Sequence, residues 1–241
     1  MKLVEFSPKT AEENIALDEL LLSGAEKGVI GETLRFWEVP ETAVILGRAG
    51  KTDEDCITSR CASEGVKIIR RTSGGGTVLQ GEGCLNYSLV LAYKGDSSYR
   101  DVIASYRVIL GKIAGKLKEA GIDLTVEPVS DLALGGRKVS GNAQARKKKF
   151  FLHHGTFLYN FDLENIGRYL KHPAREPGYR KGRGHADFLT NIPASRSVLE
   201  KAVKDVFGLS GAKRQPSAED LGELGRLVRE KYSRDSWNLA F

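Results

Sequence analysis

Three consecutive glycines, Gly74–Gly76, follow Arg70 and Arg71 and separate two apolar runs of β-strand character. Glycines between strands give up side-chain packing and carry a large entropic cost when they become ordered, so their presence needs a physical reason. One reason is close approach to a ligand, because a backbone without Cβ atoms can direct several N–H groups into one concavity. With two arginines beside it, the segment predicts a site for an anionic carboxylate or phosphate. A glycine-rich hairpin with solvated arginines is the alternative.

The common glycine-rich nucleotide motifs do not match this segment. A Walker loop places Gly-Lys-Ser or Gly-Lys-Thr at this point, and here Thr77 and Val78 follow the glycines. The dinucleotide fingerprint spaces its glycines and leads into a helix, whereas these glycines are contiguous and lead into a predicted strand. The motif therefore indicates anion binding without identifying the anion.

The composition of the 241 residues is that of an ordinary globular protein, with 41% apolar and 28% charged residues. No run approaches the ~20 apolar residues of a membrane span, and the first residues lack the apolar stretch of a signal peptide. We therefore predict a cytoplasmic protein without a membrane partner. The net charge of +6 admits an anionic partner. Three cysteines without a CxxC pair, Cys56, Cys61 and Cys84, predict reduced thiols.

Turn signals and hydrophobic periodicity predict the first elements. Thr10, followed three positions later by Glu13, predicts the capped start of a helix. Leu34–Trp37 and Ala43–Arg48 are expected to form the two arms of a hairpin around a proline turn. Apolar residues at helical spacing predict a long core-facing helix over 99–120.

The same signals predict the fold class. One short helix is expected to contain both Cys56 and Cys61, and Gly135–Gly136 is expected to close a hairpin. Because hairpin signals outnumber β-helix-β alternations, the prediction is an α/β (α+β) fold with a mixed, largely antiparallel sheet flanked by helices. Residues 1–194 are expected to form one domain, and residues 195–241 a short helical C-terminal tail.

Four sets of polar residues are candidates for chemistry. They are Arg71 with Ser73–Gly76, Asn86, Asp131 with Lys138, and His153 with His154. Lys138 is the sharpest candidate, because tight turns flank it and its ammonium can reach a carboxylate or phosphate as a positioned charge. Asp131 can hold Mg²⁺ on a phosphate or pair with Lys138. A surface lysine in a plain salt bridge is the competing interpretation.

The histidines and the third cysteine have weaker claims. His153 and His154 are adjacent on a predicted strand and point to opposite faces, so at most one of them faces a given pocket. Neither has another ligand at metal-binding spacing, so hydrogen bonding or packing is expected. Cys84 lies in a glycine-rich turn with no histidine nearby in sequence, and we expect a buried structural thiol.

Five ordered blocks of sequence resemble the signature blocks of the lipoate-protein ligase A family. They are Arg70–Val78, Leu85–Ser88, Ser130–Leu132, Arg137–Ala143 and His154–Thr156. Two earlier stretches, Asn14–Glu19 and Ile45–Arg48, are similar to that family too. The match spans most of residues 1–160, and five blocks in order are far more specific than one motif.

The resemblance implies a fold shared with biotin ligases and octanoyltransferases and related to the catalytic core of class II aminoacyl-tRNA synthetases. Residues 1–194 would then be the catalytic domain. Ligases of this family convert lipoate and Mg-ATP to lipoyl-adenylate and pass the acyl group to a lysine of a lipoyl domain. The implied cofactors are ATP and Mg²⁺, and lipoate is the implied substrate. The implied partner is a lipoyl-domain acceptor protein, either a 2-oxoacid dehydrogenase E2 or the glycine cleavage H protein.

The resemblance also implies roles for residues. Lys138 is expected to be catalytic by bridging carboxyl and phosphate oxygens, and Asp131 to help place magnesium. Arg71 is expected to steady the negative charge that develops beside the glycines. The residues expected to bind substrate are Arg71, Ser73, Gly74, Gly75, Gly76, Thr77, Asn86, Lys138, Gly141, Asn142, His154, Gly155 and Thr156. The residues expected to line an acyl tunnel, where burial stabilises by ~0.8 kcal/mol per CH₂, are Val44, Leu46, Val78 and Leu79.

Two departures from the family pattern affect these expectations. Ser130 stands where the ligases often have asparagine, which weakens the case for the metal site. The tail after residue 194 is much shorter than the accessory domain of the longest ligases. A short ligase of this kind implies either a separate accessory protein or a supply of preformed adenylate.

Three alternatives remain. An octanoyltransferase of the same fold uses a cysteine in the region matching 147–152 or close after Lys138, and this sequence has none in either place. A biotin-type ligase is the second alternative. The third is a non-enzymatic nucleic-acid-binding module, but the basic cluster Arg175–Arg183 offers only Tyr179 for base stacking. This cluster and the other, Arg146–Lys149, are better explained as a docking surface for an acidic lipoyl domain or for ATP phosphates.

Overall fold

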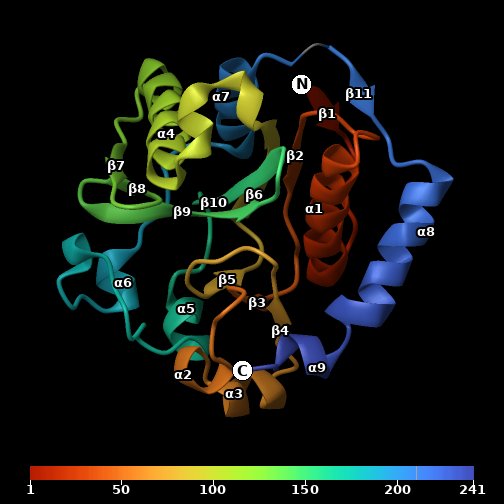
Figure 1. Ribbon diagram of the computed structural model, residues 1–241. Helices are drawn as coiled ribbons and strands as arrows, with labels where there is room; N and C mark the ends of the chain where they lie inside the picture. Colours follow the sequence, from red (N-terminus) through yellow and green to blue (C-terminus); the bar gives the residue numbers. More distant parts are fainter. Residues whose placement is uncertain (210) are drawn as a thin grey trace.

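The computed structural model describes residues 1–209 and 211–241 (Figure 1). Within these residues the strands form one large sheet and one small sheet. The large sheet contains, in spatial order, β11 (Lys213–Arg214), β1 (Lys2–Val4), β2 (Thr33–Trp37), β6 (Cys84–Ala92), β10 (Phe150–Leu158), β9 (Arg137–Arg146), β8 (Asp131–Leu134) and β7 (Thr125–Glu127). The small sheet contains β4 (Lys67–Arg70), β3 (Ala43–Leu46) and β5 (Val78–Gln80).

The pairing of the strands confirms the predicted fold class. In the large sheet, β1 pairs in parallel with β11 and with β2, and every pair from β2 to β7 is antiparallel. In the small sheet β3 is parallel to β4 and antiparallel to β5. The turn Gly135–Gly136 closes the predicted hairpin between β8 and β9, with Leu134 opposite Arg137. The result is a mixed, largely antiparallel sheet with helices on its faces.

Helices cover both faces of the large sheet. The α-helices are α1 (Ala11–Glu26), α2 (Thr52–Asp55), α3 (Thr58–Ser63), α4 (Val102–Glu119), α5 (Glu164–Tyr169), α6 (His185–Phe188), α7 (Arg196–Phe207), α8 (Ala218–Leu227) and α9 (Asp235–Asn238). Short 3₁₀ or π turns cover Tyr93–Gly95, Ser97–Arg100, Gly178–Arg180 and Val228–Tyr232. As Figure 1 shows, α4 and α7 lie on one side of the sheet, and α1 and α8 lie on the other.

The two longest helices begin where their sequences predict. Thr10 caps α1 by accepting from the Glu13 N–H, and the Glu13 carboxylate accepts from the Thr10 N–H at 3.1 Å, which completes a capping box. Asp101 caps α4 in the same way, because its carboxylate accepts from the Ala104 N–H at 2.6 Å. The prediction of a long helix over 99–120 is therefore confirmed, with α4 preceded by a 3₁₀ turn.

Two local predictions are wrong. Leu34–Trp37 and Ala43–Arg48 are not arms of one hairpin, because β2 pairs with β1 and β6 in the large sheet while β3 belongs to the small sheet. The proline turn correctly marks the end of β2, but a turn signal does not determine which strand β2 pairs with. Cys56 and Cys61 do not share a helix. Cys56 lies between α2 and α3 in an extended conformation and forms an isolated bridge with Leu170.

The segment after residue 194 packs against several parts of the fold. Leu199 and Val203 of α7 are fully buried in the cluster beneath α4, β11 extends the sheet, and α8 packs on α1. The expected boundary at residue 194 remains a prediction. The contacts show that the tail and the preceding residues share hydrophobic clusters, because Leu224 and Tyr232 lie in one cluster with α1.

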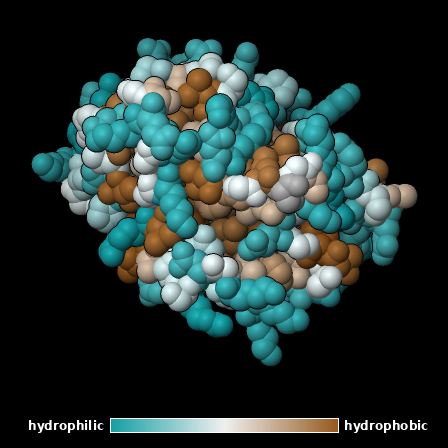
Figure 2. Space-filling model, turned by 90° about the horizontal axis from the view of Figure 1, so that it is seen from above, coloured by the Kyte–Doolittle hydropathy of each residue, from teal (hydrophilic) through white to brown (hydrophobic). Residues whose placement is uncertain are grey.

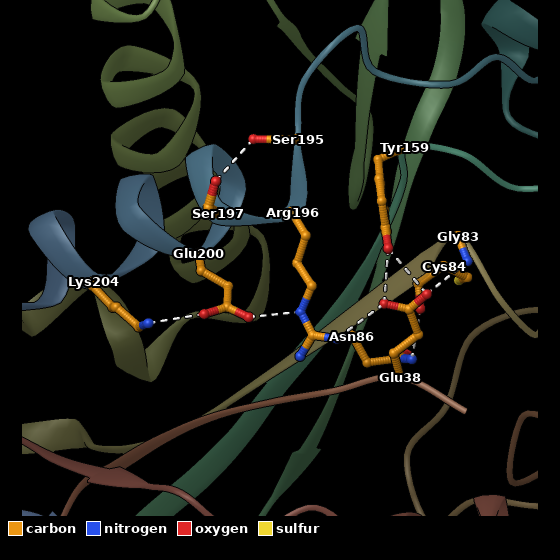
Figure 3. Close-up of polar contacts among 10 residues, drawn as sticks. All are labelled: Glu38, Gly83, Cys84, Asn86, Tyr159, Ser195, Arg196, Ser197, Glu200 and Lys204. Carbon is orange, nitrogen blue, oxygen red and sulfur yellow. Dashed lines mark hydrogen bonds and ion pairs between the residues drawn. The ribbon is translucent and has the colours of Figure 1, made fainter. Parts of the chain in front are cut away.

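A polar cluster fixes the start of α7 to the sheet (Figure 3). The Glu38 carboxylate accepts from the Gly83 N–H at 2.6 Å and from the Tyr159 hydroxyl at 3.1 Å. Arg196 bridges this carboxylate, at 3.2 Å, to Glu200 of its own helix, at 2.8 Å. One carboxylate therefore joins the end of β2, the turn before β6, the end of β10 and the first turn of α7.

The surface is mixed in polarity. On the face shown in Figure 2, hydrophobic residues appear in separate patches between hydrophilic side chains. In the described part of the chain, no helix has both the length and the apolar character needed to span a bilayer.

Candidate active site

The ladder of the large sheet brings the sequence blocks together. In β10, His154 lies opposite Ala143 of β9, and Gly155 lies opposite Asn142. On the other side of β10, Thr156 lies opposite Asn86 of β6. Blocks separated by up to seventy residues therefore occupy adjacent positions on three neighbouring strands.

Gly155 makes room for the Asn142 side chain. A Cβ atom at Gly155 would lie 1.7 Å from Asn142 Oδ1, so any larger residue would displace the amide. In its position, Asn142 accepts from the Tyr87 hydroxyl at 2.6 Å and donates from Nδ2 to Ser130 O at 2.8 Å. Asn142 thus fixes the turn that carries Ser130, immediately before Asp131.

Arg71 lies beneath the glycine segment, with only 6% of its surface exposed. Its Nη2 donates to Gly74 O at 2.6 Å and to Gly76 O at 2.8 Å. Its other donors reach Ser73 Oγ at 2.9 Å and Ile45 O at 3.1 Å. Burial lowers the pKa of this guanidinium to about 10, still well above neutral pH. Arg71 therefore holds the carbonyls of Gly74 and Gly76 on the inner side of the glycine segment. The expected direct contact of Arg71 with substrate stays a prediction.

The N–H groups of the glycine segment remain available. Gly74, Gly75 and Gly76 are exposed, and their N–H groups donate to no acceptor within the described residues. Gly75 has a φ of 86°, a conformation that favours glycine, and its carbonyl packs so closely on Gly47 that a Cβ there would lie 2.0 Å away. With carbonyls held inward, a row of free N–H donors is the feature expected of an anion cradle.

A buried chain of polar groups holds the start of the segment. Ser73 Oγ lies 2.6 Å from His154 Nε2, and His154 Nδ1 lies 3.4 Å from Asp18 Oδ2. Asp18 forms a fully buried ion pair with Arg35 at 2.8 Å and accepts from Ser88 Oγ at 2.8 Å. Burial opposes ionisation of Asp18, but Arg35 and His154 outweigh it and lower the pKa of the carboxyl. The chain links helix α1, strand β10 and the glycine segment.

Lys138 and Asp131 form the predicted pair. Lys138 Nζ lies 2.9 Å from Asp131 Oδ1, and the Tyr179 hydroxyl donates to Asp131 Oδ2 at 2.8 Å. Burial, followed by the charge of Asp131, raises the pKa of Tyr179, which therefore stays protonated as a donor. A Cβ at Gly141 would lie 2.9 Å from Lys138 Nζ, so this glycine leaves space for the ammonium.

The glycine segment and the Lys138 ammonium meet over β9. A Cβ at Gly75 would lie 3.6 Å from the Ala143 Cβ, and the Lys138 ammonium lies over Gly141. Gly141 and Ala143 are two residues apart on one strand and therefore face the same side. The sequence-predicted cradle and the predicted ammonium are thus neighbours in space.

Two of the predicted site residues point elsewhere. Asn86 accepts from Gln80 Nε2 at 2.7 Å and lies beside Cys84 and the Glu38 cluster, as Figure 3 shows. Thr77 donates to Asp55 Oδ2 at 2.6 Å. Their hydrogen bonds fix strand ends and helix α2, so their expected contact with substrate stays a prediction.

Three residues of the site were missed by the sequence interpretation. Asp18 belongs to α1, Arg35 to β2, and Tyr179 to the loop that precedes α6. A signal existed for the first two, because a carboxylate in a strongly apolar helix and an arginine in an apolar strand both call for a buried partner. The path of its loop brings Tyr179 to Asp131, and no local sequence pattern predicts that path.

The expected acyl tunnel does not form as predicted. Val44, Leu46 and Leu79 pack into the cluster with α5 and α6, whereas Val78 packs against the cluster that contains Ile45 and α1. Alternate residues of a strand face opposite sides, so the four residues cannot line one channel. Two surface cavities of about 340 and 380 Å³ lie elsewhere and are lined by none of the predicted site residues.

The three cysteines are buried, as expected for structural thiols. Burial raises the pKa of Cys56 and of Cys84 to about 12, and it also raises the pKa of Cys61. Because the thiolate is the nucleophile, none of the three is prepared for acyl transfer. His153 is equally buried, and burial lowers its pKa to about 3, which fits the expected packing role.

The basic clusters divide into buried and exposed members. Arg180 is only 4% exposed and lies 4.8 Å from the centre of the Phe188 ring, so the idea that it faces a docking partner is wrong. Lys181 and Lys147–Lys149 are exposed. Tyr179 is turned inward onto Asp131, which removes the one aromatic residue available for nucleic-acid stacking in this cluster.

Side chains that could bind a metal ion do not cluster in the described part of the structure. Among residues 1–209 and 211–241, no three His, Cys, Asp or Glu side chains gather as a metal site. A lone carboxylate such as Asp131 still suits Mg²⁺, which takes most of its ligands from phosphates and water. Each Asp131 oxygen has one partner, Lys138 or Tyr179, and keeps a further lone pair that can bind an ion.

Exposed N–H groups without an acceptor among the described residues, beside a positioned ammonium, form an arrangement suited to an anionic group. The sequence model of a protein family, the lipoyl protein ligase A/B catalytic domain, matches residues 10–206. The chain belongs to this family. The family comprises lipoyl and octanoyl transferases and ligases, which identifies the chain as an enzyme of that kind.

Individual relatives carry two different names. The chain is 26% identical over 272 residues to the octanoyltransferase LipM of Halalkalibacterium halodurans, covering 98% of both chains. It is 25% identical to lipoate-protein ligase 1 of Staphylococcus aureus, covering 93% of this chain and 69% of the relative. Its fold is similar to the bi-partite lipoate protein ligase of Thermoplasma acidophilum, with a TM-score of 0.84, 21% identity, and coverage of 99% and 95%.

Proposed function

We propose that the chain is an ATP-dependent lipoate-protein ligase, which joins lipoate or octanoate to a lysine of a lipoyl domain through an acyl-adenylate. The observation that carries the proposal is the row of unpaired N–H groups at Gly74–Gly76, close to the Lys138 ammonium. An acyl-adenylate has an anionic phosphate oxygen and a carbonyl oxygen that gains negative charge when an amine attacks the carbonyl carbon. Two adjacent sets of fixed donors match that charge distribution.

In the first step, a carboxylate oxygen of the acid attacks the α-phosphorus of ATP, and pyrophosphate leaves. In the second step, the acceptor lysine amine attacks the acyl carbonyl, and AMP leaves. The N–H groups of Gly74–Gly76 would stabilise the oxygens that gain negative charge, and Lys138 would neutralise carboxyl and phosphate oxygens. Arg71 and Asp131 hold these groups in place in the structure without ligand.

Magnesium would enter with the nucleotide. Bound there, Mg²⁺ would neutralise phosphate charge, and Asp131 is the carboxylate placed to hold it. Ser130 supplies a backbone carbonyl to Asn142 rather than a side-chain ligand, so the metal set from this chain is small.

The second candidate is an octanoyltransferase that takes its acyl group from a carrier protein. It is favoured by relatives such as the H. halodurans LipM, which match this chain over nearly the full length of both. It is disfavoured by the thiols, because Cys56, Cys61 and Cys84 are all buried with raised pKa values. A transferase working through one of these cysteines would need that thiol exposed and ionised.

The acceptor partner is a lipoyl-domain protein in either case. The Thermoplasma structure pairs its ligase with an E2 lipoyl domain, and we extend that partner class to this chain. The exposed Lys147–Lys149 and Lys181 are candidate contacts for an acidic lipoyl domain. That structure also motivates the proposal of a separate accessory subunit.

The test is an acylation assay on a purified lipoyl domain, read by intact mass. One arm supplies ATP with lipoate, octanoate or biotin, a second supplies octanoyl carrier protein without ATP, and a third supplies preformed lipoyl-adenylate. A lipoyl domain with its acceptor lysine replaced by arginine is the control. Acylation in the first arm supports the ligase. Acylation only in the second arm supports the transferase, and acylation only in the third indicates that activation requires an accessory subunit.

A further inference from the structure

The C-terminal residues 235–241 contact the strand that leads into the glycine segment. Strand β4 is an edge of the small sheet, and its last residue, Arg70, has both main-chain groups engaged by α9. The Arg70 N–H donates to Asn238 Oδ1 at 3.0 Å, and Trp237 Nε1 donates to Arg70 O at 2.8 Å. Two side chains thus take the place of a further strand.

The Arg70 guanidinium connects α9 to the turn 47–50. It donates to Trp237 O and to Asn238 O, each at 3.1 Å. It also donates to Gly47 O at 3.1 Å and to Gly50 O at 2.6 Å. Arg70 is fully buried, and burial lowers its pKa. Every one of these partners is a main-chain carbonyl, so the guanidinium ties two segments of backbone together.

The turn 47–50 in turn supports the glycine segment. The Arg48 N–H donates to Ser73 O at 2.8 Å, and Gly47 packs against the carbonyl of Gly75. The contacts run from α9 through Arg70 and this turn to Ser73, just before the glycine segment, and to Gly75 in its middle.

A second connection reaches the other end of the segment. The Thr52 N–H of α2 donates to Phe241 O at 3.0 Å, and Asp55 of the same helix accepts from Thr77 at 2.6 Å. Residues on both sides of Gly74–Gly76 are therefore held by the C-terminal part of the chain.

We propose that Trp237, Asn238 and Arg70 are positioning residues, which set the placement of the glycine segment for the acyl group. The inference rests on the proposed function for the identity of the ligand. A purely stabilising tail would bury apolar side chains against the core. The C-terminal segment does bury apolar side chains such as Tyr232, but it also places a buried asparagine, 6% exposed, and an indole N–H on the main chain three residues before Ser73.

The variants that test this are Asn238→Leu, which removes the amide hydrogen bonds at similar size, and Trp237→Phe, which removes the indole donor. Asn238→Asp keeps the acceptor for the Arg70 N–H and is the rescue variant. Leu239→Ala is the matched control, because this neighbouring side chain is 46% exposed and holds none of these contacts. All variants are made in the full chain.

Two measurements separate positioning from general stability. Hydrogen–deuterium exchange of residues 47–51, whose Arg48 N–H is bonded to Ser73 O, is expected to accelerate about tenfold in Asn238→Leu, as for the loss of one buried hydrogen bond. Exchange in α4 should not change. The KM for the acyl acid is expected to rise about tenfold, with kcat within about threefold, and Asn238→Asp should recover part of the loss.

Either of two results would overturn the proposal. The first is unchanged exchange in residues 47–51, and the second is an acceleration of equal size in α4, which would indicate a stabilising tail only. Exchange requires no turnover. If the wild-type chain failed to acylate a lipoyl domain, the exchange data would still decide whether the C-terminal segment holds the glycine segment.

Discussion

The substitution Arg71→Leu separates the stability of the fold from the function of the glycine segment. The leucine keeps part of the buried apolar volume but removes all four hydrogen bonds of the guanidinium. Two of the lost acceptors, Gly74 O and Gly76 O, belong to exposed glycines and can bind water instead. Two others, Ile45 O and Ser73 Oγ, are buried.

The two opposing free-energy terms nearly cancel. Losing the guanidinium costs about 1–3 kcal/mol at Ile45 O and at most as much again at Ser73 Oγ, which keeps His154 Nε2 as a partner, so the total cost is about 1–6 kcal/mol. Removing a cation whose pKa burial has lowered from 12.5 to about 10 recovers about 3 kcal/mol. The net change in unfolding free energy therefore lies between a gain of about 2 kcal/mol and a loss of about 3 kcal/mol. For a chain of this size that loss corresponds to a decrease in Tm of up to about 10 °C.

The effect on binding should be larger. Without Arg71, the carbonyls of Gly74 and Gly76 are no longer held inward, so the N–H groups lose their common direction. Losing two oriented bonds to a charged ligand, at about 1.5 kcal/mol each, weakens binding about 100-fold. The measurement is titration with a non-hydrolysable acyl-adenylate analogue, alongside the KM for lipoate. Arg107→Leu, at an exposed position on α4, is the matched control.

Two outcomes would refute this reasoning. Affinity within about threefold of wild type would show that the segment keeps its shape without the guanidinium, or that it does not bind the ligand. A Tm lowered by much more than about 10 °C would show that Arg71 is a core residue of the fold, and the loss of binding would then have no specific meaning.

Three further substitutions test other parts of the site. Lys138→Met should lower acylation at least about 100-fold with a Tm change of only a few degrees, because it removes a charge beside the reacting oxygens from a half-buried pair. Gly155→Ala should cost about 1–3 kcal/mol of stability by displacing Asn142, whereas Gly111→Ala, in open space on α4, should be neutral or stabilising in the same denaturant titration. His153 has a folded pKa of about 3 and an ordinary value of 6.5, so its contribution is present above pH 6.5 and lost as pH falls. Wild type should lose up to about 2 kcal/mol between pH 6.5 and 5, and His153→Gln should lose less.

Local sequence signals were sufficient where a single element or turn decides the structure. The capping box at Thr10, the periodicity of α4 and the Gly135–Gly136 hairpin all appear as predicted. These features depend on neighbouring residues only, which a sequence shows directly. The pairing of β2 failed for the opposite reason, because its partner, β6, is about fifty residues away and all five β2 residues are buried, so no alternation marks its faces.

The sequence pointed to several polar residues of the candidate site but not to the buried residues that hold them in place. Lys138 with Asp131, and His154 with Ser73, lie within contact distance, although only the first pairing was among the expectations. Buried charge was harder to predict. Arg180 lies in a loop of basic residues and was expected at the surface, but its guanidinium packs on an aromatic ring and donates to a main-chain carbonyl. The composition of a loop predicts that the loop is polar, but whether one side chain such as Arg180 points inward or outward depends on the tertiary fold.

The two adjacent arginines show how charge is distributed around the site. Arg70 and Arg71 are both buried, burial lowers the pKa of each, and the hydrogen bonds of both guanidinium groups go to carbonyl or hydroxyl oxygens rather than to carboxylates. Lys138, in contrast, has Asp131 as its counter-ion. Of the two arginines, Arg71 lies beneath Gly74–Gly76, and its charge has no carboxylate partner among the described residues. An anion bound there would supply the missing counter-charge, so part of the cost of burying Arg71 would be recovered on binding, and the fold would be stabilised by its ligand.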